Sequence, residues 1–287
     1  MTRIAVQGTP EGAGSGLTTR LNPGGVLIPF DASAASSALP PRFPSPFRPG
    51  VAHPLVAQAS AETQAFLDGE RGLPRRLFEG PTGGKMMGVL VVRAEDGRLG
   101  YLRAFAGAVD GRDRIEGFAP PLFEVERYRD VWREGSAAIT ELDERIQATC
   151  TSDADRRALE QEQRALSHSV HERLWASYRI PNGRGERSDL PSLFAPRRPP
   201  GGAGDCAAPK LLALAYSMGA TPIALGEFWW GKAPPGGGRQ HGVHYPACRG
   251  RCGVILPFML EGIDCEAAPD VGMRPVGNPG DPGFQPG

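Results

Sequence analysis

The spacing of apolar residues predicts a short helix followed by a β-hairpin in the first half of the chain. In PLVAQASAETQAFL (residues 54–67), small and apolar residues recur every three to four positions, as on one face of a helix. In GKMMGVLVVRAEDGRLGYLRAFAG (residues 84–107), two apolar runs rich in β-branched residues flank the turn sequence EDG. We expect strands near residues 87–93 and 98–106.

A charged segment from Gly135 to Tyr178 predicts a helical hairpin. After Gly135 the segment has no glycine or proline, and its apolar residues form two stripes at helical spacing. The sequence CTSDADRR separates the stripes, and Ser152 or Asp153 is suited to cap the second helix. We expect this hairpin, residues 135–178, to be a solvated packing element inserted into the domain. Docking of a protein partner on the hairpin is the alternative.

The last third of the chain predicts a helix, a strand and a second helix. Apolar spacing favours helices from Cys206 to Met218 and from Cys248 to Leu260, and the apolar run TPIALGEFWWG between them favours a buried strand. Both helices begin with a cysteine.

Stretches rich in Pro and Gly delimit the domain. They predict a flexible arm over residues 1–50 and a disordered tail over residues 266–287. We therefore expect a single α/β domain over residues 51–265, with residues 200–262 as its cysteine-containing core.

Composition and charge narrow the classes of function. The 32 Lys and Arg residues equal the 32 Asp and Glu residues, so the whole chain has no basic excess typical of nucleic-acid binding. No apolar run approaches the roughly 18 residues that span a membrane, and the first residues lack the apolar core of a signal peptide. Five cysteines without such a signal favour reduced thiols or a metal over disulfides. We expect a cytoplasmic protein with no membrane association.

Three of the cysteines occur where they can share a metal ion. Cys248 and Cys252 are four residues apart, which on a helix places both sulfurs on one face. Cys206 lies at the start of the earlier helix, where unpaired N–H groups and the helix dipole favour a thiolate. A strand between two such helices brings both helix starts to the same edge of a sheet. Because thiolates bind Zn²⁺ well, we expect zinc.

The fourth ligand decides what kind of metal site this is. Three cysteines with a water molecule form an open site typical of catalysis, whereas His244 or His241 as fourth ligand closes a structural site. The sequence favours the structural site, with His244 as the ligand. The alternative without a metal is three reduced thiols in the core. We interpret Cys150 and Cys265 as structural or incidental.

The cysteine pattern resembles that of the zinc deaminases. In that superfamily a His/Cys-x-Glu motif begins one helix, a Pro-Cys-x(2–4)-Cys motif begins the next, and the Glu moves protons. Cys206 matches the first ligand, and Cys248 and Cys252 match the pair, although the proline stands one residue farther away. The glutamate position holds Ala208. Glu227, on the neighbouring predicted strand, is the carboxylate that we expect to replace it.

The loop that carries two of the cysteines is locally basic. Between Glu227 and Glu261 the sequence has no acidic residue. This pattern favours contact with RNA phosphates or another anion next to the cysteines, and an ordinary solvated loop is the alternative. One tryptophan of EFWWG, Trp229, is a candidate for stacking on a base. The residues of this predicted anion and RNA site are Lys232, Arg239, His241, Arg249, Arg251 and Trp229.

Four blocks of the sequence resemble the N-terminal extension of a long subgroup of RluA-type pseudouridine synthases. The blocks are GKMMGVLVVRAEDGRLGYLRAFAG, PPGGAGDCAAPKLLALAY, PIALGEFWWG and HYPACRGRC, and the similarity covers roughly residues 28–264. That extension also has a charged helical segment and the alanine found here at position 208. The catalytic His-Arg-Leu-Asp-type motif of the synthase domain has no counterpart, because HERLW (residues 171–175) lacks the Asp. The resemblance implies a role in RNA modification without synthase activity.

These observations predict an α/β fold, specifically a three-layer, deaminase-like mixed sheet with a β-hairpin lobe and an inserted helical hairpin. The leading hypothesis for function is a zinc-stabilised accessory domain that binds rRNA or tRNA and takes part in RNA modification. The alternative is a zinc-dependent, deaminase-like hydrolase that acts on a nucleobase or nucleotide, with Glu227 as its base.

Overall fold

The computed structural model describes residues 26–30, 38–49, 53–70, 72–80, 83–148 and 152–267. Within these residues a five-stranded sheet has the strand order β1-β3-β2-β6-β7. Two further short strands, β4 (Ile180–Pro181) and β5 (Arg187–Ser188), form a separate pair beside it. The protein is therefore of the α/β class, as the sequence predicts.

The centre of the sheet is the predicted β-hairpin. Strand β2 (Lys85–Arg93) pairs with β3 (Leu99–Phe105), and Gly97 turns the chain between them with a φ of 84°. A positive φ of this kind is accessible to glycine without steric cost. On its other side β2 pairs with β6 (Thr221–Trp230). The two edge strands are β1 (Ile28–Pro29) and β7 (His244–Tyr245).

The prediction of a mixed sheet is wrong, because all pairings of the named strands are antiparallel. Strands β3 and β6 do run in the same direction, since each is antiparallel to β2. They are not neighbours, however, because β2 lies between them.

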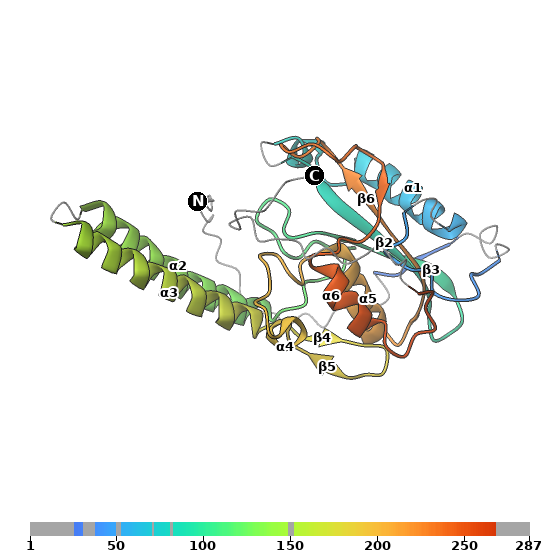
Figure 1. The fold of residues 1–287 in the computed structure, drawn as a ribbon. Helices are drawn as coiled ribbons and strands as arrows, with labels where there is room; N and C mark the ends of the chain where they lie inside the picture. Colours follow the sequence, from blue (N-terminus) through green and yellow to red (C-terminus); the bar gives the residue numbers. More distant parts are fainter. Residues whose placement is uncertain are drawn as a thin grey trace.

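Helices cover both faces of the sheet, which gives three layers (Figure 1). Helix α1 (Pro54–Asp68) packs on one face of β2 and β6. Helix α5 (Ala207–Ser217) packs on the other face, together with α6 (Cys252–Met259). Side chains of β2 alternate accordingly, with Val89 and Val91 in the α1 core and Leu90 and Val92 in the α5 core. The sheet is thus buried on both faces.

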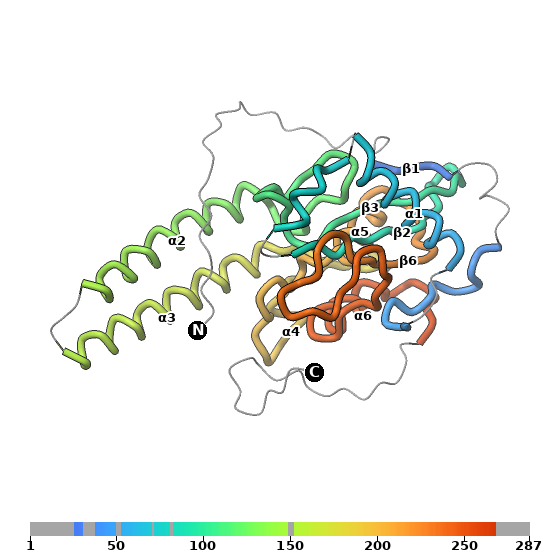
Figure 2. Tube along the Cα trace, turned by 90° about the horizontal axis from the view of Figure 1, so that it is seen from above, coloured from blue at the N-terminus to red at the C-terminus, as the bar shows by residue number. Residues whose placement is uncertain are grey.

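The helical hairpin projects from this body (Figures 1 and 2). It consists of α2 (Val125–Ala148) and α3 (Asp153–Trp175), and the Ser152 side chain accepts the N–H of Asp155 as the predicted N-cap. The hairpin starts at 125 rather than at the predicted 135. Gly135 lies inside α2, where an added Cβ would stand 2.5 Å from Cγ2 of Val170. This glycine therefore permits close helix packing instead of marking a helix boundary.

Parts of the predicted flexible ends belong to the core. Val26, Phe43 and Phe47 are buried, and the Phe43 N–H donates to the Asp264 carbonyl at 2.8 Å. The prediction of a flexible arm is therefore wrong for residues 26–30 and 38–49. The rest of the arm, and residues 268–287 of the predicted tail, lie outside the described residues.

The described part of the chain also includes the short helices η3 (Arg75–Phe78) and α4 (Leu190–Phe194). No helix in the described ranges has the length and apolar content needed to cross a membrane.

Candidate metal centre

Three cysteines converge where α5 and α6 begin. Cys206 is the N-cap of α5, Cys252 is the first residue of α6, and Cys248 lies in the turn before it. Their sulfurs lie within 4.8 Å of one another, close to the span of two Zn–S bonds of about 2.3 Å each. Cys252 is buried and the other two are half-buried. The predicted grouping of these three side chains is present in the structure.

The predicted position of Cys248 on a helix is wrong. Helix α6 begins only at Cys252, and the preceding residues form a turn. This turn directs the backbone N–H groups of Arg251 and Cys252 at the sulfur of Cys248. A helix from 248 onward would engage these N–H groups differently, so the turn is what creates a cradle for a thiolate.

Close packing of α5 on the sheet fixes the first cysteine. A Cβ at Gly88 of β2 would lie 2.8 Å from Cβ of Ala207, so only glycine lets the start of α5 approach the strand this closely. The residue before the cysteine is also held, because the Tyr178 hydroxyl donates to Asp205 Oδ1 at 2.6 Å. The Gly107 N–H donates to the Asp205 carbonyl at 2.8 Å.

The three thiols form one hydrogen-bonded group. Hydrogen bonds from Cys206 and Cys252, and then from the two backbone N–H groups, lower the pKa of Cys248 to about 2. Donation to Cys248 in turn raises the pKa of Cys206 to about 12. Hydrogen bonds to Cys206 and then to Cys248 raise the pKa of Cys252 as well. One thiolate is therefore formed readily. A thiophilic cation bound here would replace the remaining protons, because cysteine binds metals as the thiolate.

Glu227 lies buried beside this cluster. It is the residue of β6 opposite Gly88 of β2, and its Oε1 accepts the N–H of Ala208 at 3.2 Å. Burial raises its pKa to about 7. The Ala208 hydrogen bond opposes this shift, the charge of Cys248 adds to it, and Arg239 opposes it. A carboxyl group that changes its charge near neutral pH is suited to accept and return protons.

His244 is not part of the cluster, so the prediction of this residue as a metal ligand is wrong. It pairs with Phe228 across β6 and β7, and its Nε2 lies 2.9 Å from Oγ of Ser60 in α1. Both contacts are on the α1 face, whereas the cysteines lie on the α5 face. Burial lowers the pKa of His244. The alternation of side chains along a strand explains the error, because a shift of one residue changes the face.

The predicted anion site divides into separate places. The guanidinium of Arg239 lies 4.2 Å from the ring centre of Tyr245, which pairs with Glu227 across the sheet and so faces the cluster. Arg249 and Arg251 are exposed and lie between Cys248 and Cys252 in sequence. This subset therefore belongs to the segments next to Glu227 and the cysteines.

The other predicted members lie elsewhere. Lys232 and His241 line a cavity of about 280 Å³ together with Arg75 and Glu79. Trp229 is only 8% exposed, and its indole N–H donates to the Lys232 carbonyl. Trp229 is therefore a structural residue, and the predicted stacking of its ring on a base is wrong.

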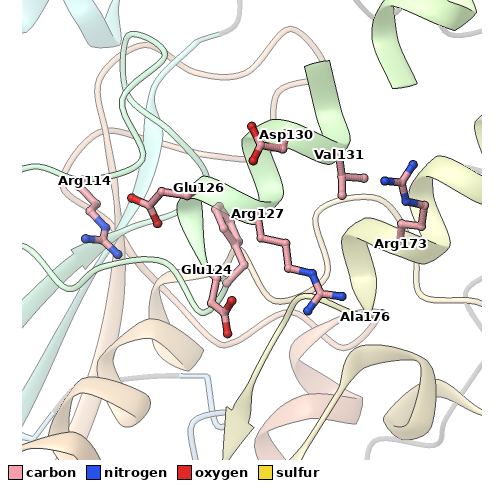
Figure 3. Close-up of a pocket in the computed structure, with 9 residues that line it drawn as sticks. Arg114, Glu124, Glu126, Arg127, Asp130, Val131, Arg173 and Ala176 are labelled. Atoms are coloured by element: carbon pink, nitrogen blue, oxygen red, sulfur yellow. The ribbon is translucent and has the colours of Figure 1, made fainter. Parts of the chain in front are cut away.

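Sequence reasoning missed two other features. The first is a charged cleft of about 730 Å³ where the hairpin joins the body (Figure 3). No sequence motif marks it, since its charged groups come from the loop before α2 and from both hairpin helices. Those groups are Arg114, Glu124, Glu126, Arg127, Asp130 and Arg173.

The second missed feature is Lys210, which is 2% exposed. A signal for it exists in the sequence, because a lysine four residues after Cys206 lies one helical turn further along the same face.

No family model, curated protein or solved structure matches the chain. The resemblance to the extension of RluA-type synthases therefore stays a prediction.

Proposed function

We propose that this protein is a zinc-dependent hydrolase of the deaminase type. The observation that carries the proposal is the position of Glu227, a buried carboxylate at the start of α5 beside three clustered cysteines. No fourth His, Cys, Asp or Glu of the described ranges joins this cluster. Three protein ligands are the number found in catalytic zinc sites.

The donor set fits zinc. Three thiolates from Cys206, Cys248 and Cys252 are soft ligands, which select Zn²⁺ over Mg²⁺ or Ca²⁺. When bound, zinc lowers the pKa of water toward neutrality and thus supplies a nucleophile.

The residues of the chain provide the proton transfer. One carboxylate oxygen of Glu227 is fixed by the Ala208 N–H, which leaves the other oxygen to take a proton from water and pass it to a leaving amine. Zinc deaminases carry their glutamate two residues after the first ligand, which is position 208 here. The backbone N–H of Ala208 holds Glu227. A carboxylate therefore lies at the start of α5, although it comes from strand β6 and not from the helix.

The arrangement of the elements gives further support. Apart from the helical hairpin and short elements inserted after it, the β2–β3 hairpin is followed by α5, β6 and α6, with the proposed ligands at or just before the start of both helices, as expected from the resemblance to deaminases. The proposed reaction replaces an amino group on an unsaturated ring carbon by oxygen, consuming one water and releasing one ammonia. Arg239, held on the Tyr245 ring next to Glu227, favours a substrate with an anionic group such as a nucleotide phosphate.

The test combines metal content with ammonia release. The purified full chain is expected to hold one zinc per chain and to release ammonia from one member of a panel of nucleosides, nucleotides and RNA. Glu227→Gln should keep the zinc and lose activity by roughly 10²–10⁴-fold, the usual contribution of general acid–base catalysis. Cys206→Ser should lose the zinc. A wild-type chain without zinc, or full activity in Glu227→Gln, would refute the proposal.

A second candidate is the non-catalytic module that the sequence favours, a zinc-stabilised domain that binds RNA during RNA modification. The observation in its favour is that exposed Arg249 and Arg251 lie between Cys248 and Cys252 in sequence, while Arg239 lies on the Tyr245 ring. RNA binding that falls steeply with added salt, and that weakens when these three arginines are neutralised together, would support it. Absence of RNA binding at low salt would end it. The helical hairpin, with Trp132 40% exposed, remains the proposed surface for a protein partner.

A further inference from the structure

Lys210 is a buried ammonium group close to the cysteine cluster. It lies on α5, four residues after Cys206, so the two Cα atoms are about 6 Å apart along the helix axis. Its side chain is 2% exposed and faces the end of β3. Water therefore does not solvate this positive charge.

The direct partners of Lys210 are neutral. Its Nζ donates to the carbonyl oxygens of Phe105 at 3.0 Å and Gly107 at 2.8 Å, and it lies 4.9 Å from the Phe105 ring centre. Within the described ranges, no carboxylate approaches Nζ to ion-pair distance. A buried charge without an ion-pair partner is costly, because carbonyl dipoles replace only part of its hydration.

Lys210 senses negative charge from the start of α5 and from the loop before α2. Asp205, Asp113 and Cys206, in that order, favour the protonated amine, against the stronger effect of its burial. Asp205 is engaged by the Tyr178 hydroxyl. Three thiolates around a divalent ion leave one negative charge, and this charge would be held one turn from Lys210 in the same poorly solvated layer.

We propose that Lys210 is the counter-charge of the three-thiolate metal site, a positioning residue that stabilises the metal-bound form. This inference rests on the metal site of the proposed function. It assigns Lys210 no contact with substrate. The lysine and the cluster each reduce the electrostatic cost of burying the other, which explains why a lysine lies in a core lined by Ala207 and Leu211.

The experiment separates the charge of Lys210 from its hydrogen bonds. Lys210→Gln removes the charge and keeps an N–H donor for the carbonyl groups, whereas Lys210→Met removes both. Zinc affinity of the full chain is measured by competition with a chromophoric chelator, and the thiolate-to-metal bands are recorded with Co²⁺. Both variants should bind zinc about 10–100-fold more weakly, the usual effect of losing a group next to the ligands.

Arg103→Met is the matched control. Arg103 is also a buried cation, 8% exposed, which donates to a backbone carbonyl (Gly117, 2.9 Å) and lies over the Phe66 ring on the α1 face. This variant should lose thermal stability and keep its zinc affinity. If Lys210→Gln binds zinc with wild-type affinity, the proposed role of Lys210 as counter-charge is refuted, whatever the zinc affinity of Lys210→Met. A wild-type chain that binds no zinc would refute the metal site itself. Neither of these outcomes depends on the release of ammonia.

Discussion

Substitution of Glu227 by Gln should stabilise the metal-free protein, by an amount that depends on pH. The side chain is 6% exposed, and its pKa is raised from 4.5 to about 7, mainly by burial. Gln has the same shape and can still accept the Ala208 N–H. The variant therefore removes the ionisation of this residue and little else.

The sign and size follow from proton linkage. Between pH 4.5 and about 7 the unfolded chain releases the proton of Glu227 while the folded chain retains it, so stability falls as the pH rises. Each pKa unit corresponds to about 1.4 kcal/mol, which gives about 3 kcal/mol over the whole interval. At pH 4.5 the wild type and Glu227→Gln should thus have similar free energies of unfolding. Above pH 7 the wild type should be about 3 kcal/mol less stable than Glu227→Gln.

Urea unfolding in the presence of a chelator measures this difference. Free energies of unfolding of both proteins are determined from pH 4.5 to 8. The thiols are common to both proteins, so only their coupling to the charge of Glu227 enters the difference. A difference that stays constant over this range would mean that Glu227 ionises normally in the folded chain. The carboxylate would then be solvated, and its proposed role as a base poised near neutral pH would lose its physical ground.

Three further substitutions test the fold and the ligand set. Gly135→Leu should separate the hairpin helices, because even a Cβ would lie 2.5 Å from Val170. It should lower the stability measured by thermal unfolding by about 1–3 kcal/mol. The control Ala137→Leu, at an exposed position of the same helix, should not lower it. Tyr178→Phe removes the hydroxyl bonded to the half-buried carboxyl before the first cysteine and should cost about 1–3 kcal/mol in urea unfolding. His244→Ala should leave the zinc content, measured by elemental analysis, unchanged. A loss of zinc in this variant would show that His244 is a ligand.

The features that the sequence predicts well are local ones. The β2–β3 hairpin follows from apolar runs around a turn, and its strands lie within two residues of the expected ends. The cap at Ser152 follows from the break between two apolar stripes. Cys206 and Glu227 meet because one helix and the next strand form a compact unit, in which the strand returns past the helix start. Short connections leave few alternative arrangements.

The features that it misses depend on contacts between distant segments. Residues 38–49 are rich in proline and have no periodicity, but they are ordered by pairing with the chain near residue 265. His244 is close to two cysteines in sequence, yet strand register places it on the opposite face. From the sequence, Gly135 looks like a helix boundary. Its close contact with Val170 of the second helix leaves no signal in the neighbouring residues.

Four polar or ionisable groups gather at the start of α5. Within six residues the chain supplies the half-buried carboxyl of Asp205, a thiol, an N–H group that fixes Glu227, and the ammonium of Lys210. A helix start is suited to this role, because its first N–H groups have no partner within the helix. The N–H of Ala208 is one of them, and the carboxylate of Glu227 from the adjacent strand accepts it. Position 208 holds Ala and not Glu, but the backbone of this residue holds Glu227, so a carboxylate is still present at the start of α5.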